Sequence, residues 1–116
     1  MKQYLDKDQT AKLIELGFPK PRFSFPIEDN EHPDYVDEEG IPWSIVESYS
    51  VGELIEFLPN RIDSGLIDFF FGRMEWFIRY EDRHNMPPLT LKQWLSRELI
   101  DALFCACVTL KEEGVI

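Results

Sequence analysis

The chain has few cysteines and no basis for a disulfide scaffold. Only two cysteines, Cys105 and Cys107, occur in 116 residues. Two residues apart on a helix, their side chains would point in nearly opposite directions, so they cannot pair with each other. We interpret both as small buried hydrophobic residues in a reducing cytoplasm.

Long apolar runs are also missing. Charged residues interrupt every stretch of about ten residues, whereas a membrane-spanning helix needs about 20 consecutive apolar residues. The N-terminal stretch MKQYLDKDQT lacks the apolar core of a secretion signal. We therefore expect a cytoplasmic protein without membrane association.

Hydrophobic residues make up 44% of the chain, which argues against disorder, and the length predicts a single domain over residues 1–116.

Basic residues are scarce relative to acidic ones. The chain has 12 Lys and Arg against 22 Asp and Glu, a formal net charge of −10. Nucleic acids and anionic membranes would be repelled, so we expect no direct binding to either. Two interpretations remain open. The acidic surface binds a basic protein, or it only keeps a small protein soluble.

The C-terminal stretch 90–114, TLKQWLSRELIDALFCACVTLKEEG, predicts the longest helix. Thr90 and Gln93 match a T-x-x-Q capping box, and Gly114 stands where a left-handed residue ends a helix. Residues 99–110 are almost entirely apolar, so we expect this helix to be buried on two sides.

Each of the two faces of this helix needs a cover. One face contains Leu95, Leu99 and Leu103, and the other contains Ile100, Phe104 and Cys107. We expect a sheet to cover the first face. The second is covered by shorter helices in a monomer, or by another copy in a homodimer. We favour the monomer, because the shorter helices otherwise have nowhere to bury their own apolar sides.

Two shorter helices carry clear end signals. Residues 9–16 can be capped by Asp6 or Asp8 and ended by Gly17. Residues 51–58 follow an S-x-x-E capping box made by Ser50 and Glu53.

The stretch 66–80, LIDFFFGRMEWFIRY, predicts a β-hairpin. Gly72-Arg73 fits a two-residue type II′ turn, in which the first residue has a positive φ. In that register three apolar pairs share one face: Phe71 with Met74, Phe69 with Trp76, and Ile67 with Ile78. We expect this face to pack on the C-terminal helix.

The stretch 18–49 is rich in prolines and carboxylates, yet it also contains many large apolar residues. We expect an ordered loop that lies across the core, with short strands at 35–36 and 43–46, and residues 43–47 as a third strand for the hairpin. The predicted fold class is α+β: a small antiparallel sheet of two to four strands packed on a long C-terminal helix, with two shorter helices.

The second face of the hairpin is a candidate protein-binding surface. Phe70 and Phe77 would lie there as diagonal neighbours, beside Glu75 and Arg79. The alternative is that residues 18–49 cover them.

The sequence contains few residue patterns that are typical of a catalytic site. No catalytic residue, cofactor site or metal ligand is predicted, and His32 among the acids of 28–39 lacks the glycine spacing of an EF-hand. The enzymatic alternative is a small nuclease or other hydrolase that uses Arg79, Glu81, Asp82 and His84, with His84 as general base. The spacing of Arg79 and His84 matches the R-x4-H pattern of HEPN ribonucleases. That family carries the motif on a helix, whereas here it follows a predicted strand.

Four segments together resemble a set of short uncharacterised proteins encoded by bacterial prophages and mobile elements. They are 8-DQTAKLIELGF-18, 50-SVGELIEFLP-59, 74-MEWFIRYED-82 and 98-ELIDALFCACVTLKEEG-114. The resemblance implies an accessory gene product in a bacterial cytoplasm, and it transfers no functional residues. With the acidity and the lack of catalytic constellations, the prediction is a non-enzymatic, acidic, protein-binding accessory factor with a protein partner.

Overall fold

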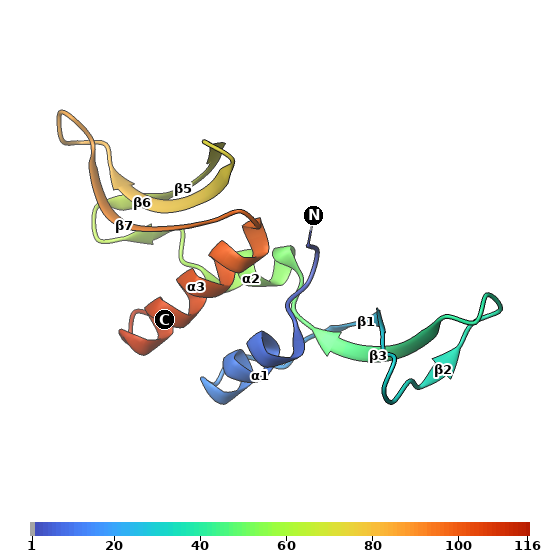
Figure 1. Cartoon of the computed structure of the whole chain (residues 1–116). Helices are drawn as coiled ribbons and strands as arrows, with labels where there is room; N and C mark the ends of the chain where they lie inside the picture. The colour runs from blue at the N-terminus through green and yellow to red at the C-terminus, as the bar shows by residue number, and fades with distance from the viewer. Residues whose placement is uncertain (1) are drawn as a thin grey trace.

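A computed structural model describes residues 2–116 and shows an α+β fold of three helices and seven strands (Figure 1). The elements run in the order α1 (Lys7–Glu15), β1 (Phe23–Glu28), β2 (Tyr35–Val36), β3 (Pro42–Ser48), α2 (Val51–Phe57), β4 (Arg61–Ile62), β5 (Gly65–Gly72), β6 (Glu75–Asp82), β7 (Leu89–Ser96) and α3 (Leu99–Glu112). The α+β class is confirmed. The expected antiparallel sheet on the C-terminal helix is present, in the order β4-β5-β6-β7, but a second antiparallel sheet, β1-β3-β2, was not expected.

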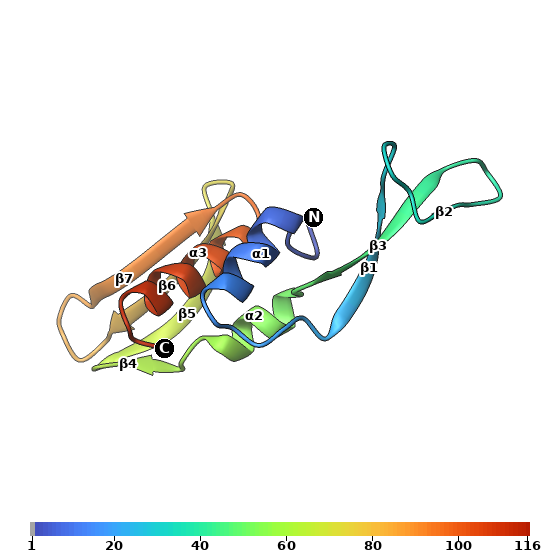
Figure 2. The ribbon, with the colours of Figure 1, turned by 90° about the horizontal axis from the view of Figure 1, so that it is seen from below.

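The four-stranded sheet and the three helices form one unit, which we call the body. Helix α3 lies between the sheet and the other two helices, and it contacts β6 and β7 on one side and α1 and α2 on the other (Figures 1 and 2). Its buried residues are Ile100, Ala102, Leu103, Ala106, Cys107 and Leu110. The predicted burial of the C-terminal helix on two sides is therefore confirmed, and both covers come from the same chain.

The predicted start of the C-terminal helix is wrong. Residues 89–96 form strand β7, and α3 begins only at Leu99, after an N-cap residue, Glu98, whose side chain makes no capping bond. In β7 the Trp94 side chain points toward α3, where its indole Nε1–H donates to the Thr109 hydroxyl at 3.1 Å. Pairing with β6 satisfies the backbone of a whole strand, which outweighs the one local cap suggested by Thr90.

The predicted caps of the shorter helices are confirmed, although α1 begins two residues earlier than the predicted 9–16 and both helices end one residue earlier than predicted. Asp6 caps α1 in a complete capping box, and Ser50 caps α2 in another. Gly17 follows α1 with φ +95°, and Gly114 follows α3 with φ +76°. These signals were readable because each depends on residues within four positions of the helix end.

The hairpin is present, but its turn lies one residue later than predicted. Arg73 and Met74 both have positive φ and form the turn, so Gly72 pairs with Glu75 and Phe71 with Trp76. Two positive φ values are typical of a type I′ turn, whose twist matches that of the flanking strands. The register therefore shifts by two residues. Side chains alternate with a period of two, so the strand residues that share each face stay as predicted. Met74 is the exception, because it lies in the turn and is exposed rather than on the apolar face.

The stretch 18–49 does not lie across the core, which corrects the prediction. The predicted strands at 35–36 and 43–46 are confirmed, but they join β1, which was not predicted, in a separate sheet. Residues 43–47 therefore add no strand to the hairpin. Its neighbours in the four-stranded sheet are β4 and β7.

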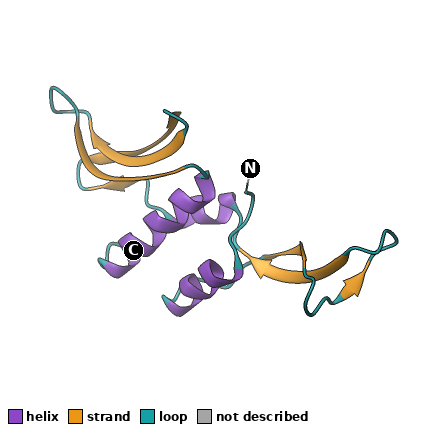
Figure 3. Ribbon diagram, viewed as in Figure 1, coloured by secondary structure: helices purple, strands orange, loops and turns teal. Residues whose placement is uncertain are grey.

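Residues 23–48, which we call the arm, project from the body. The helices all belong to the body, and the arm consists only of strands and turns (Figure 3). The radius of gyration is 16.9 Å and the longest extent is 59 Å, whereas a compact domain of this length has a radius of gyration of about 13 Å. The molecule is thus markedly elongated.

The base of the arm is fastened to the body by hydrogen bonds and ring stacking. The Ser48 hydroxyl donates to the Leu5 carbonyl oxygen at 2.6 Å and lies 3.0 Å from the Thr10 hydroxyl. The rings of Tyr4 and Phe25 stack with centroids 4.4 Å apart. Beyond these contacts the arm has no core of its own.

Among residues 2–116, no helix is long and apolar enough to span a membrane.

Two leucines that the sequence placed on one helix face have different environments, which gives a test of the fold. Leu103 is 0% exposed, while Leu95 is 50% exposed on β7. We expect Leu103→Ala to lower the free energy of unfolding by about 2–5 kcal/mol, because it leaves a cavity. Leu95→Ala should change it by less than about 1 kcal/mol. Urea titration of both variants measures the difference, and equal losses would contradict the strand assignment of 89–96.

The two cysteines also differ, and the expectation that both are buried is wrong for Cys105. Cys105 is exposed, while Cys107 is 0% exposed with its Sγ 3.7 Å from the Leu54 carbonyl oxygen. Burial raises the pKa of Cys107 to about 12. Partial burial and the nearby Asp101 carboxylate raise the pKa of Cys105 as well.

We therefore expect a thiol reagent at pH 8 to label Cys105 slowly in the native protein and Cys107 only after unfolding. Mass spectrometry of the labelled peptides measures this. Cys105→Ser is the control, since it should leave no thiol that reacts in the folded state. Native labelling of Cys107 would contradict the packing of α3 against α2.

Candidate functional site

The predicted protein-binding face of the hairpin exists, with closer packing than expected. Phe70 and Phe77 lie directly opposite each other, with parallel rings and centroids 4.7 Å apart. The Arg79 guanidinium carbon lies 4.6 Å from the centroid of the Phe70 ring, a cation–π contact. Glu75 is on the same side of the sheet, where it pairs with Gly72 beside the turn. The strand register thus brings all four predicted residues onto one face.

This face is open, but its charges are balanced. Arg79 contacts Asp68 at 3.4 Å and Glu81 at 3.1 Å, and Arg83 contacts the same two carboxylates at 3.4 and 3.5 Å. The arm projects from the opposite end of the molecule and does not cover the face, which corrects the alternative raised by the sequence (Figure 2). Four paired charges around one aromatic pair make a small mixed patch with no net attraction for a charged ligand.

The residues of the enzymatic alternative are divided between the two faces of β6. Arg79 and Glu81 pair on the open face, while Asp82 accepts hydrogen bonds from the Ser64 hydroxyl at 2.6 Å and the Asn85 side-chain amide at 2.9 Å. The Ser64 hydroxyl and the His84 backbone amide lower the pKa of Asp82. His84 reaches Asp82 through its backbone N–H, so Asp82 does not orient the imidazole as a general base. No group of three or more metal-ligating side chains occurs among residues 2–116.

The arm holds most of the charge of the protein. Residues 23–48 contain eight carboxylates and no Lys or Arg, so the arm accounts for −8 of the formal −10 and the remainder of the chain is close to neutral. None of the ten ion pairs between residues 2 and 116 includes an arm carboxylate. Within the described residues the negative charge of the arm is therefore not neutralised by ion pairs, and Lys7 acts on Asp29 only through its longer-range charge.

Two of the arm carboxylates also order its turns. Asp37 accepts hydrogen bonds from the Trp43 indole at 2.8 Å and from the Ile41 amide at 2.9 Å, and both bonds lower its pKa. Asp29 accepts from the His32 amide and the Ser44 hydroxyl, with the same effect on its pKa. Both groups are ionised at neutral pH, so the turns keep the negative charge in place.

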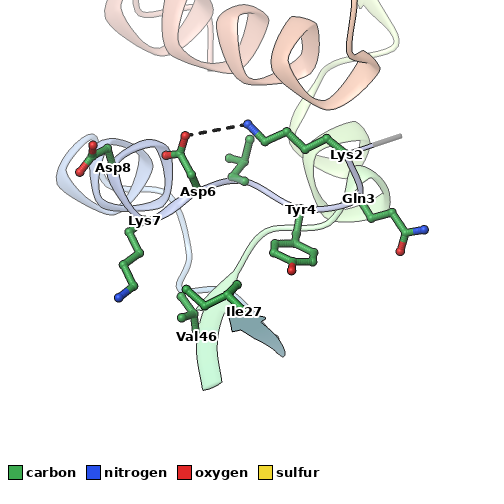
Figure 4. Close-up of a pocket in the computed structure, with 9 residues that line it drawn as sticks. Lys2, Gln3, Tyr4, Asp6, Lys7, Asp8, Ile27 and Val46 are labelled. Atoms are coloured by element: carbon green, nitrogen blue, oxygen red, sulfur yellow. Dashed lines mark ion pairs between the residues drawn. The ribbon is translucent and has the colours of Figure 1, made fainter. Parts of the chain in front are cut away.

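A groove of about 770 Å³ lies where the arm meets the body (Figure 4). Tyr4 from the N-terminal segment, Ile27 from β1 and Val46 from β3 form its apolar surface, while the side chain of Leu5, which also borders it, is buried in the core of the body. Its polar rim consists of Lys2, Gln3, Asp6, Lys7 and Asp8. A second, acidic hollow of about 540 Å³ adjoins it and shares Lys7 and Val46. Sequence reasoning missed this groove. The alternating F-S-F-P-I-E of β1 was a signal for a strand, but the surrounding prolines obscured it.

Comparisons with known proteins found no matching family model, curated protein or solved structure. The function must therefore be argued from the surfaces of the chain itself.

The bond between Asp37 and Trp43 makes the order of the arm sensitive to acid. A carboxylate whose pKa is lowered by folding contributes stability above its unfolded pKa, and that contribution is lost as pH falls through the folded pKa. For Asp37 this window lies below the ordinary value of 3.8. We expect the Trp43 indole N–H resonance to titrate with a midpoint below 3.8 in NMR spectra, and Asp37→Asn to abolish that titration.

The Trp94 indole provides the control, because its partner, the Thr109 hydroxyl, does not titrate in this range. A Trp43 midpoint at or above 3.8 would contradict the hydrogen-bonded turn.

Proposed function

We propose that this chain is a non-enzymatic accessory factor, of the kind that mobile elements encode, and that its acidic arm binds a basic surface of a partner protein. The observation that carries the proposal is the segregation of charge. A projecting arm of −8, whose carboxylates make no ion pair among residues 2–116, is attached to a nearly neutral body. Acidity that served only solubility would have no need to concentrate on one projection.

Electrostatic physics supports this assignment. Charges of one sign on a thin projection are mostly surrounded by water, and they steer a partner of opposite sign toward the arm. Nucleic acids are disfavoured as direct ligands because their phosphates would meet the same negative field. A basic protein surface is favoured instead. If that surface itself binds nucleic acid, the arm would compete with the phosphates for it.

The arm also has the apolar residues that a stable interface needs. Large apolar side chains stay exposed on it beside the acids: Phe23, Tyr35, Val36 and Ile45. Long-range charge mainly raises the rate of encounter, while burial of aromatic and aliphatic groups supplies much of the affinity. The arm therefore combines an electrostatic and an apolar component.

The test is affinity capture from a bacterial lysate at about 0.15 M salt, with the full chain as bait and quantitative mass spectrometry as readout. The arm variant carries four Glu→Gln substitutions at side chains that make no hydrogen bond or ion pair within residues 2–116: Glu28, Glu31, Glu39 and Glu47. We expect the wild type to enrich basic proteins, and the arm variant to recover about tenfold less of them, because half of the arm charge is gone.

A body variant with four matched Glu→Gln substitutions is the control, at Glu15, Glu56, Glu75 and Glu112. It changes net charge equally and should retain the partner. A salt concentration of about 1 M, where the Debye length is about 3 Å, should release it. If the wild type recovers no partner, or if partner recovery falls equally in the arm variant and the body variant, the proposal that the arm binds the partner is contradicted.

A further inference from the structure

The groove at the base of the arm has a composition that the acidic arm alone does not explain. Tyr4 forms one wall, and Ile27 and Val46 form the other, so residues distant in sequence bring three apolar side chains together (Figure 4). The stack of Tyr4 on Phe25 and the bonds of Ser48 to the body hold the two walls in place. The groove is thus a preformed apolar surface, and no ordering of the chain is needed before a ligand enters.

The acidic hollow next to the groove determines which ligand is complementary. It is lined by Asp29, Glu31, Asp34 and Glu47, against the single cation Lys7. Asp29 and Asp34 are occupied by hydrogen bonds within the arm. Glu31 and Glu47 are exposed and have no ion-pair partner among residues 2–116. An apolar surface therefore continues directly into a surface with an excess of three negative charges.

We infer that this groove binds an exposed segment of a partner protein, in which a large aliphatic or aromatic side chain is flanked by Lys or Arg. The apolar side chain lies between Tyr4, Ile27 and Val46, and the flanking cation lies against Glu31 and Glu47. The inference rests on the proposed function, because the segment belongs to the basic partner of the arm. It adds a specific position and a specific sequence preference to that function.

Other occupants fit less well. Nucleic acid and anionic small molecules would face the acids beside the groove. A second copy of this chain would bring another acidic arm against the first, and like charges in an interface oppose association. A segment that is both apolar and basic satisfies the two adjoining surfaces together.

The test uses two fluorescein-labelled peptides that have the same lysines at both ends and differ only in the middle, Leu-Leu in one and Ser-Ser in the other. Fluorescence anisotropy measures the binding of each to the full chain. We expect the Leu peptide to bind the wild type about tenfold more tightly, the effect of burying roughly one leucine in an open groove. The Ser peptide should bind weakly, through charge alone.

Two groove variants locate the effect. Ile27→Thr with Val46→Thr keeps β-branched side chains on both strands but makes the groove polar, while Val46→Phe fills it. In both variants the affinity for the Leu peptide should fall to that for the Ser peptide, and the affinity for the Ser peptide should not change. Circular dichroism of each variant checks that it is folded. The matched control is Leu66→Thr with Leu89→Thr, at exposed strand positions that line neither hollow. It should preserve the tenfold preference.

The failures of the two proposals are distinguishable. If the wild type binds both peptides equally, and the arm variant with four Glu→Gln substitutions binds neither, the groove inference is overturned and the arm proposal stands. A preference for leucine that persists in both groove variants also overturns the inference, because the apolar contact is then elsewhere. If the wild type binds neither peptide even at low salt, both proposals fail.

Discussion

The packing of α3 between the four-stranded sheet and the two shorter helices is the constraint on which the rest of the structure depends. Its residues Leu103, Ala106 and Cys107 are fully buried. Neither the sheet nor the shorter helices form an independent core, because each has only one apolar side. A helix with two apolar sides joins them. The hydrophobic stabilisation of the chain is therefore concentrated in the body, and the arm is left outside it.

That division has a physical consequence for the acidic residues. Eight like charges near a core would repel one another where water screens them least. On the arm they are distributed over turns and strands at the surface. Two of them also stabilise the arm, because Asp37 accepts a hydrogen bond from the Trp43 indole and Asp29 accepts one from the Ser44 hydroxyl. The arm can thus carry a strong negative field with little effect on the core. The body contains the hydrophobic core and the arm contains most of the net charge. Substitutions that change the charge of the arm therefore do not alter the packing of α3.

The sequence predicted what depends on neighbouring residues and failed where distant segments compete. The caps at Asp6 and Ser50 and the glycine at 114 were readable because each acts within one turn of a helix. The hairpin faces were right except at Met74, which lies in the turn, since a shift of two residues preserves alternation along the strands. Residues 90–96 were misread because their leucine spacing fits a helix, and nothing local shows that the edge of β6 needs a partner. For the candidate surfaces, alternation placed Phe70 and Phe77 together. The groove was beyond prediction, because Tyr4, Ile27 and Val46 come from three separate segments.

The two candidate surfaces differ in the property that matters for binding a charged partner. On the open face of the four-stranded sheet, Arg79 and Arg83 already neutralise Asp68 and Glu81, so an incoming cation would have to displace existing pairs. On the arm the carboxylates have no such partners within residues 2–116, so a cation gains contacts without breaking any. The groove adds an apolar surface at the point where the arm is fixed most firmly to the body, through Ser48 and Tyr4. A segment bound there would touch the rigid base of the arm and its charged extension at once. This combination favours the arm and its base over the sheet face as the functional surface.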